Sequence, residues 1–446
     1  MSTVGMSPVG SPAETPPDAL NCAAGDSTRG YPGASSTSSA TVTTSTTGTS
    51  MDATRGFIVG TRGSALALAQ TQLVVDALTP HLSQPLDVQI ITTHGDTTRA
   101  HLVDLAQQGH TGVFANAIRR ALLEGQIDLA IHSCKDLPAD PCPGLEILAM
   151  PPRGATADCL CTTAGWTLET LPEGARVGTG SPRRAAQLLR VRPDLSIVPI
   201  RGNIERRLRY LEEPVLNTPI GSGSGSGDGS CSDAPLDAVV LAEAGLQRLA
   251  ARDTEADTVL RYISQRLPFL PSPAQGALAL EVRMDTTPAP LRQALLAINH
   301  QPTLLAAIAE RALLRTLHAG CELPIGAEAT AQIHPQTRGV ELTLRAEILS
   351  PDGRERNVVE HTVTVPQLSW AEESAAAAAA EIAAAEVAGA GVAGAESAAG
   401  LLAAAPLDID PGLVDPAYYA EAHEAQLAAA YQLGQMVARR LQANAR

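Results

Sequence analysis

The hydrophobic positions of the chain follow two different periods from residue 57 onward. Short apolar runs at 57–60, 127–133 and 236–241 are typical of buried strands. Between such runs, apolar residues recur at helical spacing, most clearly in the segment 113–125, which ends at a glycine. The apolar face of that segment consists of Val113, Phe114, Ala117, Ile118, Ala121 and Leu122. Strands that alternate with helices predict a parallel α/β architecture.

The sequence also predicts where two of these helices begin. In GTGSPRR, Ser181 is a predicted N-cap and Pro182 takes the first helical position, where the missing N–H leaves no hydrogen bond unmade. In RGNIERRL, Asn203 is predicted to cap the next helix. Each cap follows a predicted strand, so both helices are expected to start at the carboxyl end of a strand.

The pattern changes after residue 301. Residues 302–320 read as one long helix, and 340–350 and 354–365 alternate as strands on either side of the turn PDG. Together with a final helix at 422–442 they predict a third domain of α+β type.

Composition shifts along the chain predict the domain boundaries. Residues 1–54 are rich in Ser and Thr and have little apolar content, which predicts a disordered tail. The predicted ranges are 55–152 with 276–298 for the first α/β domain, 153–275 for the second with a Gly/Ser insertion at 214–234, and 299–446 for the third with an Ala-rich insertion at 371–415.

Charge and cysteine content exclude several classes of protein. The formal net charge of −15 argues against a nucleic-acid or anionic-membrane partner, because phosphate binding needs a basic surface. Seven cysteines without a CxxC pair predict neither a disulfide scaffold nor a metal site. We expect a soluble, cytoplasmic protein, because the cysteines are best explained as free thiols and the sequence shows neither an apolar run of membrane-spanning length nor a signal-peptide pattern.

Positive charge gathers at the predicted strand ends. Of the 32 Lys and Arg residues only Lys135 is a lysine. The candidates at strand ends are Arg62, Ser64, Ser181, Arg183, Arg184, Arg201, Arg206 and Arg207. Arginine in the first turn of a helix is unfavourable unless an anion neutralises it, which favours a carboxylate- or phosphate-binding site over isolated surface charges or intrachain ion pairs.

His132, Lys135 and Asp136 share one predicted strand end. Their spacing fits a salt bridge in a loop. It fits equally well a site in which Asp136 acts as a general acid, base or charge stabiliser and Lys135 as a compact hydrogen-bond donor that can change protonation.

Taken together, the motifs resemble those of the hydroxymethylbilane synthase family, also called the porphobilinogen deaminases. The matching segments occur in order and are GTRGSALALAQT, THGD, GVF, LAIHSCKDLP, GTGSPRR, RGNIERRL, AEAGLQRL, LPSPAQGAL and AERALLRTLHAGCELPIG. The resemblance implies two periplasmic-binding-protein-like α/β domains and a third α+β domain with a helix-covered antiparallel sheet. It also implies a monomer.

The resemblance further implies a reaction and its residues. A dipyrromethane cofactor is linked to Cys321, four porphobilinogen molecules are added to it with loss of ammonia, and hydrolysis releases the linear tetrapyrrole. Asp136 is the implied catalytic carboxylate and Phe114 an aromatic lid residue. The residues implied to bind cofactor and substrate are Arg62, Ser64, Gln70, Lys135, Ser181, Arg183, Arg184, Arg201, Arg207, Arg248 and Gln275. The sequence departs from the family in the lid segment at Gln107, Thr111, Asn116 and Ala117.

Two other functions stay open from the residues alone. One is a non-catalytic carboxylate-binding protein of the same two-domain architecture, although the third domain argues against it. The other is a Schiff-base enzyme with Lys135 as nucleophile. Borohydride trapping of substrate on Lys135 would favour the second, and a thioether-bound pyrrole on Cys321 would favour the synthase.

Overall fold

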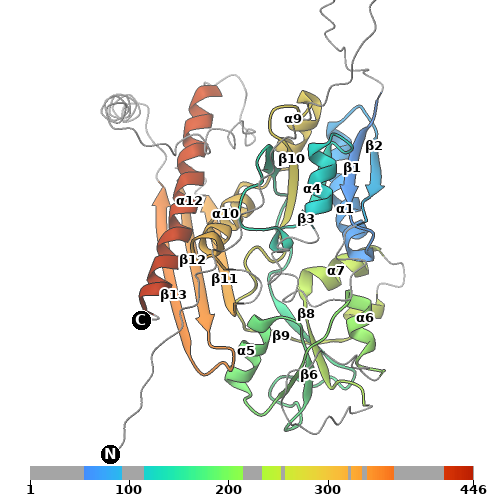
Figure 1. The fold of residues 1–446 in the computed structure, drawn as a ribbon, viewed down its shortest axis with the longest axis vertical. Coiled ribbons are helices and arrows are strands. Elements are labelled where there is room, and N and C mark those ends of the chain that lie inside the picture. Colours follow the sequence, from blue (N-terminus) through green and yellow to red (C-terminus); the bar gives the residue numbers. More distant parts are fainter. Residues whose placement is uncertain are drawn as a thin grey trace, which may run out of the picture. The chain divides into compact units, whose positions relative to one another are not determined.

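Three β-sheets organise the chain, as the computed structural model shows (Figure 1). The structure describes residues 55–92, 115–213, 234–252, 257–319, 323–333, 339–365 and 416–444, all within the unit Asp52–Arg446. The predicted tail and insertions lie outside the described residues except for Ala234, and so do Gln107, Thr111, Phe114 and Cys321.

The first sheet has the strand order β2-β1-β3-β10-β4. Its strands are β1 (Phe57–Thr61), β2 (Leu86–Ile90), β3 (Leu129–Ser133), β4 (Leu145–Ala149) and β10 (Leu278–Arg283). Helices α1 (Ala65–Leu78) and α9 (Ala289–Ala297) pack on one face, and α4 (Asn116–Leu123) packs on the other. A short 3-10 helix, η1 (Thr79–His81), follows α1. The apolar residues of both faces are buried, as their spacing predicts.

The second sheet has the order β7-β6-β8-β5-β9. Its strands are β5 (Asp158–Cys161), β6 (Arg176–Gly178), β7 (Ser196–Val198), β8 (Ala238–Ala242) and β9 (Ile263–Leu267). Leu188 of α5 (Pro182–Val191) is buried against one face, and α6 (Ile204–Arg209) and α7 (Glu243–Arg252) pack on the other. The short helix α8 (Asp257–Leu260) precedes β9.

Both sheets are mixed, so the predicted parallel arrangement holds for some strand pairs and is wrong for others. Neighbouring strands β1, β2 and β3 are parallel, but β10 is antiparallel to β3 and β4. In the second sheet β5 is antiparallel to β8 and β9. Strands β5 and β10 enter directly from the other sheet instead of after a helical crossover. The crossover rule that makes successive strands parallel therefore does not apply to them.

The two segments that link the sheets contact each other. Residues 150–157 lead from β4 to β5 and residues 268–277 lead from β9 to β10. The Gly154 N–H donates to the Gly276 carbonyl over 3.1 Å. Gly276 has φ +86°, and a Cβ there would lie 2.5 Å from the Gly154 oxygen. Only glycine allows the links to approach so closely.

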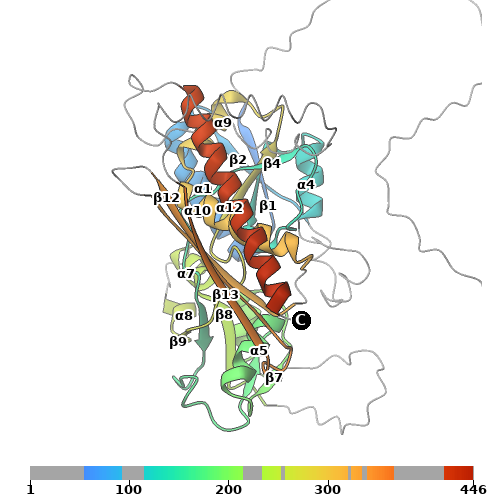
Figure 2. The same ribbon diagram turned by 90° about the vertical axis from the view of Figure 1, so that its left-hand side faces the viewer.

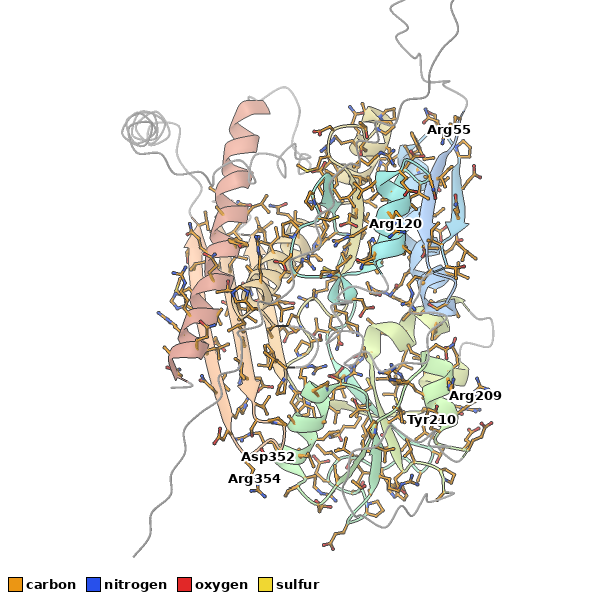
Figure 3. The ribbon with its side chains drawn as sticks, in the orientation of Figure 1. Arg55, Arg120, Arg209, Tyr210, Asp352 and Arg354 are labelled. Atoms are coloured by element: carbon orange, nitrogen blue, oxygen red, sulfur yellow. The ribbon has the colours of Figure 1, made fainter. Side chains whose placement is uncertain are left out.

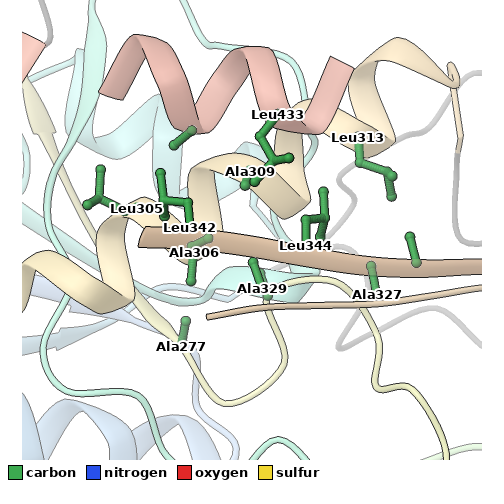
Figure 4. Packing of buried hydrophobic residues seen from close by; sticks show 14 of the residues in the cluster. Ala277, Leu305, Ala306, Ala309, Leu313, Ala327, Ala329, Leu342, Leu344 and Leu433 are labelled. Carbon is green, nitrogen blue, oxygen red and sulfur yellow. The ribbon is translucent and has the colours of Figure 1, made fainter. Parts of the chain in front are cut away.

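The third sheet is antiparallel and consists of β11 (Ile325–Ile333), β12 (Val340–Leu349) and β13 (Arg356–Val365). Helices α10 (Gln301–Thr316) and α12 (Pro416–Asn444) cover one face of it (Figure 2). Its core is aliphatic, with Ala306, Ala309, Leu342, Leu344 and Leu433 packed together (Figure 4). The predicted hairpin and long helix are confirmed. No described helix is long and apolar enough to cross a membrane.

Candidate functional site

The ends of β1 and β3 form the first part of the site. Ser64 follows β1 and caps α1, because its Oγ accepts a hydrogen bond from the Ala67 N–H over 3.2 Å. Ser133 ends β3, and its Oγ donates to Gln70 Oε1 over 3.0 Å. A residue of α1 is thereby tied to the strand that leads into the CKD motif.

A small pocket of about 70 Å³ opens at these strand ends. Its polar lining consists of Arg62, Ser64, Gln70, His132, Ser133 and Asp136. Because a cavity needs only about 10–15 Å³ to hold one water molecule, this pocket has room for a group the size of a carboxylate. Asp136 is exposed and ends η2 (Cys134–Asp136), a 3-10 turn directly after β3. The predicted strand end therefore does present this carboxylate to solvent.

Lys135 points to the second sheet's side of the site. Its Nζ donates to Gln275 Oε1 over 3.1 Å. Burial lowers the pKa of Lys135 to about 8, although the Asp136 carboxylate raises it and the Arg184 guanidinium lowers it further. A lysine with this pKa exchanges its proton near neutral pH, which an arginine in the same position cannot do.

Asp158 is the residue around which the second sheet's cations gather, and sequence reasoning missed it. It is fully buried at the start of β5 and accepts from Arg183 over 2.7 Å and from Arg184 over 2.6 Å. Gln275 Nε2 also donates to it over 2.9 Å. Burial raises the pKa of Asp158, but Arg183 and Arg184 outweigh this and hold it well below its usual range. The only sequence signal is an acidic residue at the head of an apolar strand.

The sequence predicts an anion beside the arginines in the first turn of α5, and the Asp158 carboxylate of the same chain supplies part of that negative charge. Arg183 and Arg184 are almost fully buried, and one carboxylate of Asp158 neutralises one of their two charges. The predicted cap is confirmed, since the Ser181 side chain accepts from the Arg184 N–H over 3.5 Å.

Arg207 and Arg248 belong to the same charged region. Arg207 lies on α6, whose predicted cap is also confirmed, because Asn203 accepts from the Arg206 N–H over 3.1 Å. Burial lowers the pKa of Arg207 to about 10, and the charges of Arg184, Asp136 and Arg201 act on it. Burial also lowers the pKa of Arg248 to about 10, and its guanidinium donates to the Gly276 carbonyl over 2.5 Å.

His132 lies beside a buried carboxylate of the same sheet. Its Nε2 lies 3.3 Å from Glu281 Oε2, and Arg119 Nε donates to both Glu281 oxygens over 3.0 Å. Although burial raises the pKa of Glu281, the neighbouring His132 and Arg119 side chains lower it to about 2. The partner of His132 is thus Glu281, outside the motif, and Asp136 is the exposed carboxylate of the motif.

Glu310 is a second buried carboxylate that sequence reasoning missed. It is fully buried on α10, and its oxygens accept from both terminal nitrogens of Arg153 and from the Ala329 N–H at 2.7–2.9 Å. It also accepts from the Ala274 N–H. Its place among apolar residues at helical spacing is the signal that could have identified it.

The described residues bring most of the predicted site together. Arg62, Ser64, Gln70 and Asp136 line one pocket, and Lys135, Gln275, Arg183 and Arg184 are joined through Asp158. Arg207 lies within electrostatic reach of Arg184, Asp136 and Arg201. Asn116 and Ala117 begin α4. Two mixed sheets with helices on both faces and cations gathered at their strand ends are typical of α/β proteins that bind small anions.

The chain belongs to the porphobilinogen deaminase family. The family model "Porphobilinogen deaminase, dipyromethane cofactor binding domain" matches residues 57–289, and "Porphobilinogen deaminase, C-terminal domain" matches residues 304–384.

Three relatives carry the name porphobilinogen deaminase. The protein of Thermobifida fusca is 42% identical over 72% of this chain and 89% of its own length. The Leifsonia xyli protein is 44% identical over 72% of this chain and 87% of its own length. The Cutibacterium acnes protein is 46% identical over 72% of this chain and 90% of its own length. Among solved structures, a Candida albicans protein described as having "the generic periplasmic binding protein structural fold" is 11% identical to this chain, with a TM-score of 0.27. The match covers 59% of this chain and 72% of that protein.

Proposed function

We propose that this protein is a hydroxymethylbilane synthase. It condenses four porphobilinogen molecules head to tail with loss of ammonia and releases the linear tetrapyrrole by hydrolysis. The single observation that supports this best is the chain of contacts from Lys135 through Gln275 and Asp158 to Arg183 and Arg184, beside the exposed Asp136. Each pyrrole unit carries two carboxylates, so the growing product needs several fixed cations in one place.

In this proposal the charged residues have separate roles. Lys135, Arg184 and Arg207 bind acetate and propionate groups, since Arg184 lies within electrostatic reach of both Lys135 and Arg207. Arg62 and Ser64 hold a further carboxylate in the small pocket at the ends of β1 and β3. As ammonia leaves the protonated aminomethyl group of porphobilinogen, its positive charge moves onto the pyrrole ring, and Asp136 stabilises the ring cation because a fixed carboxylate beside the ring favours the transition state over the bound ground state.

We propose Cys321 as the attachment point of the dipyrromethane cofactor. The described residues fit such a group: it carries four carboxylates, and the cations Lys135, Arg183 and Arg184 gather around the single carboxylate of Asp158, while Arg207 lies within electrostatic reach of Arg184. When bound, the cofactor supplies a covalently held primer for chain extension. Lys135, Arg184 and Arg207 would hold its carboxylates, and Asp136 would face its pyrrole nitrogens.

The test is a product and mass measurement on one preparation. Purified protein should release four ammonia molecules for each tetrapyrrole formed from porphobilinogen. Its intact mass should exceed the sequence mass by one dipyrromethane, and Cys321→Ser should lack both the added mass and turnover. An unmodified wild-type mass from cells that make porphobilinogen would remove the attachment site, and absence of tetrapyrrole would remove the function.

A Schiff-base enzyme remains the second candidate because the pKa of Lys135 is lowered to about 8, mainly by burial. Borohydride reduction in the presence of porphobilinogen would add substrate mass to the Lys135 peptide only if this candidate is correct.

We further propose the domain ranges 55–152 with 276–298, 153–275 and 299–446, a monomeric state, a cytoplasmic location and no nucleic-acid or membrane partner.

A further inference from the structure

The hairpin of the third sheet contacts the helix that carries Arg183 and Arg184. The turn between β12 and β13 holds Gly353, whose φ is +72°. A Cβ at this position would lie 2.3 Å from the Ala186 oxygen and 2.7 Å from the Arg190 nitrogen, both in α5. Figure 3 labels the neighbouring Asp352 and Arg354 at the tip of the hairpin, beside α5. The hairpin tip is therefore packed directly on the α5 backbone.

Buried side chains join the same two elements. Glu347 of β12 is 3% exposed, and its Oε1 accepts from Gln187 Nε2 of α5 over 2.6 Å. Its Oε2 accepts from Arg356 Nε over 2.6 Å. Gln187 is also 3% exposed, and its Oε1 accepts from Arg183 over 2.9 Å. The hydrogen bonds thus run without a break from Arg356 of β13 to Arg183 of α5.

The chemistry of these groups decides the direction of the amide. An ionised carboxylate only accepts hydrogen bonds, so Glu347 must meet the amide nitrogen of Gln187 and the amide oxygen must face Arg183. The Leu270 carbonyl supports the same orientation, since it accepts from Gln187 Nε2 over 2.9 Å. Without Glu347 the amide loses one of the two acceptors that hold it. Its oxygen is then less strictly aimed at the guanidinium that pairs with Asp158.

We propose that Gln187 and Glu347 form a latch by which the third sheet positions the Arg183–Asp158–Arg184 cluster for the carboxylates of the substrate. Both are positioning residues, because they act through Arg183 and touch no ligand. This proposal rests on the proposed function. It adds that the third sheet, whose first strand follows Cys321 in the sequence, sets the geometry of the arginines that bind the substrate.

The test compares Glu347→Ala with Glu347→Gln and with Glu341→Ala, a half-buried glutamate on the same strand. Glu347→Ala should raise the KM for porphobilinogen roughly tenfold and change kcat by less than about twofold, the scale of one displaced buried hydrogen bond. Glu347→Gln keeps an acceptor for Gln187 and should recover most of the KM. Glu341→Ala should behave as wild type. An unchanged KM in folded Glu347→Ala overturns the latch.

Two further measurements separate positioning from general stability. Combined with Arg183→Lys, Glu347→Ala should add little to the KM, whereas fully additive effects would show that Glu347 does not act through Arg183. Hydrogen exchange needs no turnover: amides of 183–191 should exchange faster in Glu347→Ala, while those of 204–209 should not change. Unchanged exchange in α5 overturns the latch even if the wild type forms no tetrapyrrole, a result that would by itself remove only the proposed function.

Discussion

The Lys135 ammonium of the first sheet lies 3.1 Å from the side-chain oxygen of Gln275, a residue 140 positions later in the link to the second sheet. The amide nitrogen of Gln275 in turn donates to Asp158 over 2.9 Å. One side chain therefore connects the only lysine with the carboxylate that organises Arg183 and Arg184. A ligand with several carboxylates can contact cations from both sheets at this point.

Asp136→Asn should reduce kcat about a hundred- to a thousandfold, the usual effect of removing one preorganised electrostatic partner. The side chain is exposed, so the variant should fold as the wild type does. Steady-state kinetics together with circular dichroism tests this. Near-wild-type turnover in a folded Asp136→Asn protein would contradict the assigned role.

Lys135 should bind carboxylates only while it is protonated. Since its pKa is lowered to about 8, mainly by burial, the KM for porphobilinogen should rise as the pH increases through about 8. Lys135→Arg should lose this pH dependence, and we expect it to be nearly as poor as Lys135→Ala because the site needs a compact ammonium. Reductive ¹³C-methylation followed by NMR reads the titration directly, because the chain has one lysine. A midpoint near 10.5 would contradict the prediction.

Because the pKa of Lys135 is lowered by folding, the free energy of unfolding should increase as the pH rises from about 8 to 10.5. The folded protein holds this proton less tightly than the unfolded chain does, with pKa values of about 8 and 10.5. The contribution of Lys135 to stability is therefore lost as the pH falls through 8 and fully present above 10.5. Urea unfolding of wild type and Lys135→Met across pH 7–10 should show this difference. A pH-independent difference would argue against it.

Glu281→Gln should destabilise the protein by about 3–5 kcal/mol at pH 7, because it leaves buried Arg119 and His132 without their carboxylate. Despite the opposing effect of burial, the proximity of these two residues lowers the pKa of Glu281 to about 2 from 4.5. Its stabilisation is present above pH 4.5 and is lost as the pH falls toward 2, so the two proteins should converge there. Denaturant unfolding at several pH values measures this, and a constant gap would contradict it.

Ala274→Gly should stabilise the protein by up to about 1 kcal/mol. Ala274 has φ 60°, a conformation that costs an L residue about 1–2 kcal/mol, while glycine adds entropy to the unfolded chain. Ala277→Gly is the matched control in the same link, where φ is not positive, and it should destabilise. Thermal unfolding of both variants checks the contrast. A lower midpoint for Ala274→Gly would show that the link is not strained there.

Local sequence patterns determined the elements and their starts. Apolar spacing places the helix that runs from Ala65 to Leu78 and the hairpin around PDG, and the side chains of Ser181 and Asn203 identify two helix starts. These features depend on residues within one or two turns of each other, so short-range periodicity and capping chemistry are sufficient. The gathering of cations at strand ends follows from the same patterns, because the carboxyl ends of parallel strands share one edge.

Tertiary structure decided which residues meet there. Asp158 neutralises arginines 25 and 26 positions away, and Gln275 reaches it from 117 positions away. The antiparallel placement of β5 and β10 creates both contacts, since each strand enters from the opposite sheet. Apolar periodicity reports that a strand is buried, but a pattern of period two is the same whichever neighbour it pairs with and in whichever direction. The partner of each buried charge is therefore set by the packing of distant segments.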